Sequence, residues 1–421
     1  MIDPSPPSRS LWHDPPFRRL WVGQTVSSLG STVSREALPL TAVLLLSATP
    51  MQVGLLAAAG SAAALLFGVP AGLLADRLRR RPLMIAADLA RAALLLLIPL
   101  AAVLGRLDLS VLLLVSFLVG GWTVLFDVAY PTYLPSLVPK SRLLEANSKL
   151  EAGDSVAEIG GAALGGVLVQ SVGGPLAILL DGFSFLVSAA SLSLIGRREP
   201  PPAPSIAGRG LWREALAGWG WLRRNPILRA LAAATGFFYF FGGFFGALYV
   251  LFAIRELSIQ PAILGILIAA GGVGALLGAA AARRAVARFG IGRTLVIAYW
   301  ARSFLALLTP LAPATAPWGS LFLLAGQLAG DFALMIFFVN ELSLRQSLAP
   351  AAILGRVNAS MELLALGLSP FGLLIAGAIA EGIGLRPALM IGVIGSAMGG
   401  VFLLRSPVKT VSEVTATTTL A

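Results

Sequence analysis

The chain has 421 residues, of which 57% are hydrophobic and only 12% charged, and its mean hydropathy is +0.86. Soluble domains are about half apolar and about a quarter charged, so this composition excludes a soluble globular protein and indicates an integral membrane protein. The net charge of +11 is spread over short loops between apolar runs, which excludes a continuous basic domain that binds nucleic acid. The absence of cysteine excludes disulfides and thiolate chemistry.

Apolar runs long enough to cross a membrane recur along the whole chain. A helix needs about 20 apolar residues to cross about 30 Å of hydrocarbon, and these runs carry too much Gly, Ala and Leu for the alternating strands of a barrel. We therefore expect about twelve transmembrane helices, near residues 17–46, 51–75, 83–105, 109–134, 144–171, 175–196, 226–254, 261–282, 293–312, 318–345, 355–381 and 385–404. Residues 1–16 are polar and Pro-rich, so no cleaved signal peptide is predicted.

A polar segment separates the predicted spans into two groups of six. The chain divides into an N-terminal half (1–196), a linker (197–225), a C-terminal half (226–404) and a tail (405–421). The linker is Pro-rich at first and then amphipathic, with Trp and Arg residues typical of a helix that lies on the membrane surface. Nearly all Lys and Arg residues fall on the side of the linker, which predicts that both termini are cytoplasmic.

The two halves repeat each other in sequence. ARAALLLLIPLAA, beginning at Ala90, aligns with ARSFLALLTPLAP, beginning at Ala301, at an offset of 211 residues. The same offset relates Pro15 to Pro226, Arg91 to Arg302, Gly54 to Gly265, Asn147 to Asn358 and Gly166 to Gly377. Because each half has an even number of spans, both halves enter the membrane from the same side, as in parallel repeats.

The loop after the second predicted span reads GLLADRLRRRP, from Gly72 to Pro82. Together with the repeat, it resembles the major facilitator superfamily, whose signature at this place is Gly-x-Leu-Ala-Asp-Arg-x-Gly-Arg-Lys; here Arg79 replaces the second glycine. The segment LFDVAYPTYLPSLVPKSRLLEANSKLEAGDSVAEIGGAALGG resembles in particular the macrolide-efflux and enterobactin-exporter group of drug:proton antiporters. In that segment, Ala162 stands where the antiporter motif has proline.

This resemblance implies an all-α integral membrane fold of twelve transmembrane helices in two six-helix halves. It also implies a multi-pass transporter of the bacterial inner membrane rather than an enzyme. Such a protein works as a monomer and needs a proton gradient but no cofactor or metal. Its partners would be membrane lipid, a small-molecule substrate and protons, and not nucleic acid.

The charged loop is expected to act as a gate on the cytoplasmic side. By the resemblance, Asp76 binds the first turn of the eleventh span, near residues 354–358, where the helix dipole favours a carboxylate. Arg80 would then pair with Asp127 of the fourth span, near Asp88. The expected gating residues are Gly72, Asp76, Arg77, Arg80, Arg81, Arg91 and Asp127. The alternative is that the arginines of the loop only mark the cytoplasmic side.

Several carboxylates lie inside predicted spans, where the cost of a charge makes each a functional candidate. Glu151 and Glu362 share the repeat offset, which favours a structural role common to both halves, and Asp181 lies toward the outer end of its span. Arg35 and its neighbour Glu36 point about 100° apart on a helix, so they pair only if a side chain turns. Residues near mid-span can exchange protons near neutral pH. The candidates for proton coupling or for the cavity wall are Arg35, Glu36, Asp154, Glu158 and Asp331.

The seventh span, GFFYFFGGFFGALYVLF, is rich in aromatic residues. We expect Phe238, Tyr239 and Phe245 to offer an apolar, cation-tolerant wall to a large amphiphilic substrate. The alternative for each ring is packing against lipid or neighbouring helices. The sequence contains no Walker loop, metal-ligand cluster or catalytic triad.

The predicted function is secondary active transport, in which a proton gradient drives export of amphiphilic small molecules such as drugs, macrolides or siderophore-like metabolites. One alternative is an uptake symporter for a metabolite that uses the same acidic residues. Another is a membrane sensor or scaffold that does not transport, which would need neither mid-span carboxylates nor a gate.

Overall fold

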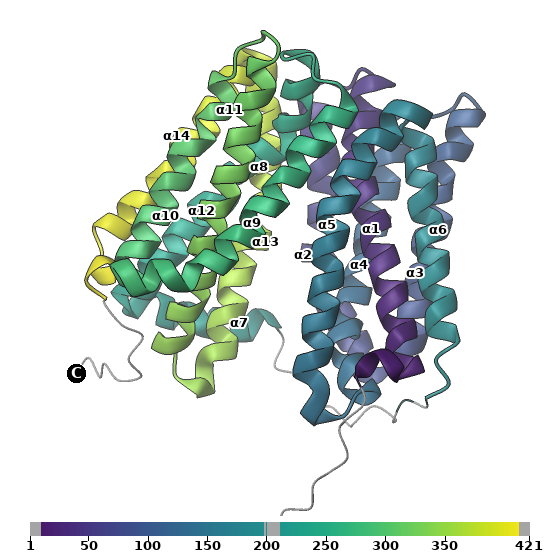
Figure 1. Cartoon of the computed structure of the whole chain (residues 1–421), viewed down its shortest axis with the longest axis horizontal. Coiled ribbons are helices and arrows are strands. Elements are labelled where there is room, and N and C mark those ends of the chain that lie inside the picture. The colour runs from purple at the N-terminus through teal and green to yellow at the C-terminus, as the bar shows by residue number, and fades with distance from the viewer. Residues whose placement is uncertain (1–9, 198, 200–210, 412–421) are drawn as a thin grey trace, which may run out of the picture.

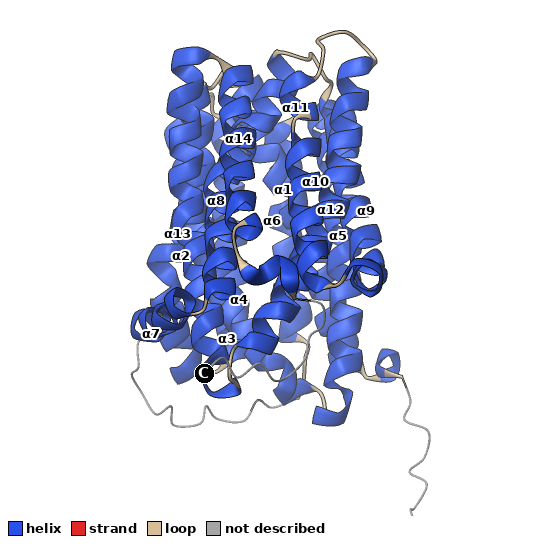
Figure 2. Ribbon diagram, turned by 90° about the vertical axis from the view of Figure 1, so that its left-hand side faces the viewer, coloured by secondary structure: helices blue, strands red, loops and turns tan. Residues whose placement is uncertain are grey.

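The computed structural model describes residues 10–197, 199 and 211–411, and these form helices joined by short loops. The predicted Pro-rich part of the linker and the tail beyond residue 411 lie outside the described residues. Two bundles stand side by side, with α1–α6 in one and α8–α14 in the other (Figure 1). A 90° turn shows the long helices running the full height of the molecule, with α7 set across one end (Figure 2).

The helix bounds follow the predicted spans closely. The first bundle contains α1 (Pro15–Leu44), α2 (Pro50–Arg77), α3 (Arg80–Val103), α4 (Leu109–Leu137), α5 (Leu143–Val172) and α6 (Gly174–Ser193). The second contains α8 (Pro226–Arg255), α9 (Pro261–Phe289), α10 (Ile291–Ala306), α11 (Leu308–Leu311), α12 (Trp318–Leu348), α13 (Ala351–Ile383) and α14 (Leu385–Leu404). Helix α7 (Leu211–Arg224) precedes the second bundle, and 3-10 turns lie at η1 (Leu11–His13), η2 (Lys140–Arg142) and η3 (Pro407–Thr410).

Eleven of the described helical segments are long and apolar enough to cross a membrane. Helix α1 is not among these segments, because its charged residues Arg18, Arg19, Arg35 and Glu36 make it less apolar than the other long helices. It is nevertheless 30 residues long and packs along α5 and α6, so it reaches the same depth as its neighbours. The all-α fold with six long helices in each half is therefore confirmed.

The backbone repeats with the offset found in the sequence. Ser47 and Ser258, 211 residues apart, have φ values of 51° and 52°, in the left-handed region that non-glycine residues seldom adopt. Gly173 and Gly384, at the same offset, have φ values of 87° and 92° and precede α6 and α14. The repeat thus extends to the turns between helices.

The bundles touch at the end opposite the termini, which we call the closed end. A Cβ on Gly166 of α5 would lie 2.2 Å from the Pro261 carbonyl of α9 and 3.0 Å from the Cα of Gly265. On the other side, a Cβ on Gly54 of α2 would lie 2.6 Å from the Leu373 carbonyl of α13. Small residues at these positions allow the two backbones to approach each other directly.

Toward the other end, where the first and last described residues lie and which we call the terminal end, the two bundles diverge (Figure 1). Every hydrogen bond found between described residues of the two bundles lies at the closed end. The molecule is therefore closed at one end and open at the terminal end.

We expect Gly166→Ala to weaken closure of the closed end, because the added methyl group would press on the backbone of α9. Gly160→Ala is the matched control, since a Cβ there meets only the Leu29 side chain at 3.6 Å. The chain has no cysteine, so spin labels on Arg106→Cys and Ile383→Cys report the distance across this end alone. A longer mean distance in Gly166→Ala only is expected; equal distances in both variants would contradict the packing argument.

Candidate functional site

A cavity of about 240 Å³ lies within the second bundle, between α8, α10, α13 and α14. The three aromatic residues singled out from the sequence, Phe238, Tyr239 and Phe245, all line it. Its polar groups come from Arg302, Ser303, Ser369 and Ser396. The wall is therefore aromatic, with hydroxyl groups and a single guanidinium. Such a surface suits an amphiphilic molecule, although the cavity is smaller than the 300–1,000 Å³ typical of drug-sized sites.

Arg302 is held at the cavity wall by small residues around it. Its Cδ lies 3.6 Å from the position that a Cβ on Gly330 of α12 would take. The next residue of α12, Asp331, packs against Gly271 of α9 and is close enough to interact electrostatically with Arg302. Among the described residues, Arg302 forms no ion pair within 4.0 Å, and its Nε has no hydrogen-bond partner. Its guanidinium can therefore still bind an acceptor group.

The repeat partner of Arg302 is Arg91, and it is bound quite differently. The Nη2 of Arg91 lies 2.5 Å from Oδ1 of Asp88, one turn earlier on α3, and both side chains are buried. Its guanidinium also lies 4.0 Å and 4.6 Å from the ring centres of Phe185 and Phe126. The resemblance described above groups Arg91 with the gate at the terminal end. In the structure, Arg91 lies in the core of the first bundle, close enough to Asp127 to interact with it electrostatically.

The mid-span charges of α1 and α5 separate into two environments. The Nη1 of Arg35 lies 2.6 Å from Oε1 of Glu158, and both side chains are more than half exposed. Charged groups exposed at this depth face a water-filled space rather than lipid, so the open region between the bundles reaches this pair. Glu36 is buried against Gly165 and does not pair with Arg35. Asp154 lies one turn before Glu158, partly buried.

These four residues are not part of the cavity wall, because the cavity lies wholly within the second bundle. Asp181 lies in the half of α6 nearer the closed end, where it is buried between helices. The Ser184 hydroxyl donates to its Oδ1 at 3.0 Å. Helix α1 approaches this carboxyl closely at Gly30. Because glycine has no side chain, the carboxyl fits there; a Cβ on Gly30 would lie 2.7 Å from its Oδ1.

At the terminal end, Arg80 and Arg81 begin α3 and contact a residue that sequence analysis missed. Their backbone N–H groups donate to the two carboxylate oxygens of Glu199, at 2.8 Å and 3.1 Å. The Arg80 guanidinium lies 3.6 Å from the same carboxylate, so its partner is Glu199 and not Asp127. Asp127 lies ten residues before the end of α4, or about 15 Å deeper, which puts it beyond the reach of the first turn of α3.

The rest of the predicted gate surrounds this contact. Arg81 donates to the backbone carbonyls of Leu192 and Ser193 at the end of α6, at 2.8 Å and 2.6 Å. Gly72 and Arg77 lie in the last turns of α2, with Arg77 exposed. Asp76 belongs to the same turns, and its side chain lies outside the part of the chain that the structure describes.

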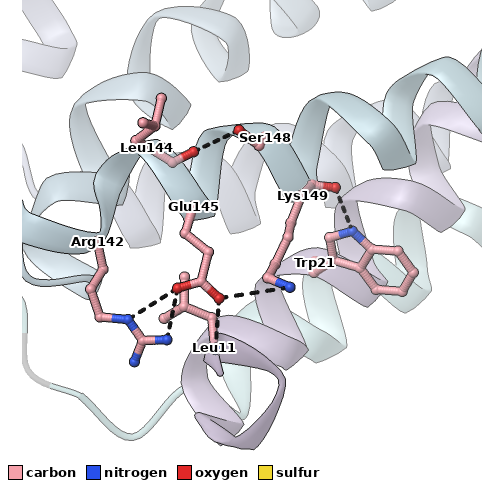
Figure 3. A network of polar contacts seen from close by, with 7 residues as sticks. All are labelled: Leu11, Trp21, Arg142, Leu144, Glu145, Ser148 and Lys149. Atoms are coloured by element: carbon pink, nitrogen blue, oxygen red, sulfur yellow. Dashed lines mark hydrogen bonds and ion pairs between the residues drawn. The ribbon is translucent and has the colours of Figure 1, made fainter. Parts of the chain in front are cut away.

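A second network at the terminal end joins the start of the chain to α5 (Figure 3). Glu145 accepts hydrogen bonds from the Leu11 amide at 3.1 Å and the Arg142 guanidinium at 2.9 Å, and it lies 3.7 Å from the Lys149 ammonium. The indole N–H of Trp21 donates to the Lys149 carbonyl at 2.9 Å. These contacts hold η1 and α1 against α5.

At the closed end, each bundle caps a helix of the other. Glu381 of α13 accepts from the Thr49 hydroxyl and, at 3.3 Å, from the Met51 amide in the first turn of α2. Gln170 of α5 accepts from the Ala262 amide in the first turn of α9 at 3.0 Å. Because 170 and 381 differ by 211, as do 51 and 262, the two caps are equivalent under the repeat. First-turn amides lack partners within their own helix, so both caps satisfy otherwise free donors.

Two further hydrogen bonds join the bundles beside these caps. Arg255 of α8 donates to the Ala48 carbonyl of the first bundle at 2.8 Å. Gln170 also donates to the Gln260 side chain at 3.3 Å. None of these contacts was predicted from the sequence, although the offset of 211 between Gln170 and Glu381 was available as a signal. Among the described residues, no group of three or more His, Cys, Asp or Glu side chains is placed to hold a metal ion.

We expect Glu381→Ala to lower the equilibrium constant for closure of the closed end up to about fivefold, because a capping carboxylate at a helix N-terminus contributes up to about 1 kcal/mol. Glu381→Gln should lose less, since its amide can cap as Gln170 does. The Arg106→Cys/Ile383→Cys spin-label pair measures the closed fraction.

Glu256→Ala is the control for this experiment. It removes a carboxylate at the same end whose partner, Arg386, lies in its own bundle at 3.2 Å. A loss of closure as large in Glu256→Ala as in Glu381→Ala would mean that capping between the bundles is not the cause.

We expect Glu199→Ala to speed hydrogen exchange in the first turn of α3 about tenfold, because a hydrogen bond to a charged group contributes about 1.5 kcal/mol. Mass spectrometry of peptides that begin near Arg79 measures this rate. Glu145→Ala removes a carboxylate that binds η1 at the same end and should leave those peptides unchanged. Unchanged exchange in Glu199→Ala would show that Glu199 does not stabilise the turn.

Comparison with known proteins places this architecture in a family. The model of the transmembrane secretion effector family matches residues 10–420. The multidrug efflux pump Tap of Mycolicibacterium fortuitum is 28% identical over 368 residues, which cover 82% of this chain and 86% of that protein. The uncharacterised MFS-type transporter YfiS of Bacillus subtilis is 28% identical over 386 residues, covering 88% of each.

Solved structures share the fold at low sequence identity. A bacterial homologue of the iron transporter ferroportin, in its inward-facing state, has a TM-score of 0.75 at 17% identity, covering 93% of this chain and 98% of that one. The nucleoside transporter NupG has a TM-score of 0.71 at 12% identity, covering 92% and 98%. The chain therefore belongs to the transmembrane secretion effector family of the major facilitator superfamily, a family of membrane transporters.

Proposed function

We propose that the protein is a proton-driven exporter of amphiphilic small molecules. In this proposal the terminal end faces the cytoplasm, so the structure represents an inward-open state in the inner membrane. The excess of Lys and Arg on the side of the termini supports this orientation. The likeness to the multidrug efflux pump Tap supports export over uptake.

The observation that carries the proposal is the pairing of an aromatic cavity with Arg302 and Asp331. Phe238, Tyr239 and Phe245 can accept a lipophilic cation, because aromatic faces attract positive charge. While Asp331 is ionised, it balances the charge of Arg302 and the cavity tolerates a cationic substrate. A proton on Asp331 leaves the charge of Arg302 unbalanced, which repels that substrate.

Proton and substrate would therefore exclude each other from the site, which is the requirement for antiport. The comparison with the first bundle supports this assignment, because Arg91 is already neutralised at 2.5 Å by Asp88. Glu36, buried in α1, is the next candidate for proton coupling. Arg35, Asp154 and Glu158 would line the aqueous path to the cavity.

The gate at the terminal end is part of the same proposal. When that end closes, Asp76 would bind the first turn of α13, near residues 354–358, where amide groups lack helical partners. Glu199 would fix the position of the loop between α2 and α3, because it binds the start of α3 through two backbone amides and one guanidinium. Arg77 and Arg81 would keep this loop at the membrane surface.

We expect purified protein in liposomes to move a lipophilic cationic dye or a macrolide when a pH gradient is imposed. Asp331→Asn mimics the protonated acid, so it should abolish both accumulation driven by the gradient and exchange of labelled for unlabelled dye, because the unbalanced charge of Arg302 repels the cationic dye. An unchanged elution volume and an unchanged melting temperature of the purified variant show that it is folded.

Asp108→Asn is the control, since Asp108 only caps α4 at Val111. Gradient-driven transport that survives in Asp331→Asn would exclude Asp331 as the coupling residue. Glu36, the next candidate, would then be tested with Glu36→Gln. A wild-type protein that moves neither compound under any gradient would contradict multidrug export.

A further inference from the structure

Helix α7 is seated firmly against the second bundle at its terminal end. A Cβ on Gly218 would lie 2.1 Å from the Arg356 carbonyl of α13, so only glycine permits this close approach. One turn later, Leu222 is 2% exposed. Trp219 and Trp221 flank this buried face of α7 on either side, 38% and 40% exposed. This is the arrangement of an interfacial helix, with aromatic residues at the level of the lipid headgroups.

Beneath α7, a groove of about 400 Å³ runs between α7, α8 and α13. Its floor is apolar and comes from α8 residues such as Ala233, Gly236, Phe237 and Phe240. The transport cavity is lined by other residues of α8, so the groove lies on a different face of the same helix. Phe237 also contacts Phe402 of α14, which places the groove on the outer side of the bundle, toward lipid.

Two arginines line the groove at one end. Arg223 comes from the last turn of α7 and Arg229 from the first turn of α8. Both are exposed, and neither has an ion pair or hydrogen-bond partner among the described residues. Two unpaired guanidinium groups beside an apolar floor are complementary to a ligand with an anionic head and a hydrocarbon tail.

The length of the groove fits one leaflet of a bilayer. Arg229 and Phe241 both line it, and the twelve residues between their positions on α8 correspond to about 18 Å. Half of the hydrocarbon thickness of a bilayer is about 15 Å. An acyl chain whose headgroup sits at the arginines would therefore follow the groove toward the middle of the membrane.

We propose that this groove is a binding site for an anionic phospholipid of the leaflet at the terminal end. Arg223 and Arg229 bind the phosphate of the headgroup, and one acyl chain lies along Ala233, Gly236 and Phe237. The lipid fastens α7 to the bundle from the membrane side. The proposal does not depend on which substrate the protein transports.

Native mass spectrometry of the purified full-length protein tests this site by titration with phosphatidylglycerol and with phosphatidylcholine of the same acyl chains. We expect one phosphatidylglycerol to bind more tightly than phosphatidylcholine. Replacing Arg223 and Arg229 by Ala should weaken phosphatidylglycerol binding about fivefold per arginine, the change that corresponds to about 1 kcal/mol per basic residue at a membrane surface. Replacing both by Lys should preserve most of the binding.

Two controls match the arginine variants. Arg224→Ala removes a neighbouring charge of α7 that does not line the groove, and Arg18→Ala removes the repeat equivalent of Arg229 in the first bundle. Both should bind phosphatidylglycerol as the wild type does. Equal weakening in the controls would mean that general surface charge attracts the lipid, which would overturn the proposal.

The acyl part of the site is tested separately with Leu368→Trp, which fills the groove from α13 beside Gly236, two turns away from Arg229. Weaker binding of phosphatidylglycerol in this variant supports the groove as the acyl site, and unchanged binding overturns it. Glycerol phosphate, added as a competitor, should not displace the lipid; displacement at comparable concentration would mean that the arginines bind a free phosphate. Equal affinity for phosphatidylcholine would also contradict the proposal.

Discussion

A charge buried in a membrane protein must be balanced by a partner, and this requirement organises the interior of both bundles. In the first bundle, Arg91 meets it through a direct ion pair with Asp88 and through two aromatic rings. In the second bundle, the equivalent Arg302 has no direct ion pair among the described residues and meets it through Asp331 on another helix, at longer range, and through the ring of Phe245 at 5.8 Å. The same residue at the same place in the repeat is thus a fixed part of the core in one half and a group at a cavity wall in the other.

The difference between the two arginines follows from the residues around them. Asp88 stands one turn from Arg91 on the same helix, whereas its repeat position in α10 holds Tyr299, which donates to two backbone carbonyls instead. Without a carboxylate on its own helix, Arg302 depends on α12. A difference of one residue type between the two copies of the repeat thus accompanies the replacement of a direct ion pair within one helix by a longer-range interaction between two helices.

The sequence predicted the helices, their division into two sixes and the repeat, because each depends on local hydrophobicity or on similarity between the halves. It also singled out Phe238, Tyr239 and Phe245, which line the cavity. It did not predict that Arg80 binds Glu199, because a lone acid in a Pro-rich segment gives no sign of the turn it will reach. Contacts of α6 with α1 and α3 likewise decide the burial of Asp181, which its position along the sequence does not predict.

The contacts at the closed end have the symmetry of a homodimer. Gly166 meets Gly265 while Gly377 meets Met51 near Gly54, and Gln170 caps α9 while Glu381 caps α2. In each case a residue of one half touches a residue of the other half. The two residues at the equivalent places in the repeat, 211 positions away, touch each other in the same way, which defines an isologous two-fold interface. Two separate copies of a six-helix unit would close this end with the same paired contacts. In the single chain the two equivalent caps differ in charge, because one is the acid Glu381 and the other the neutral Gln170.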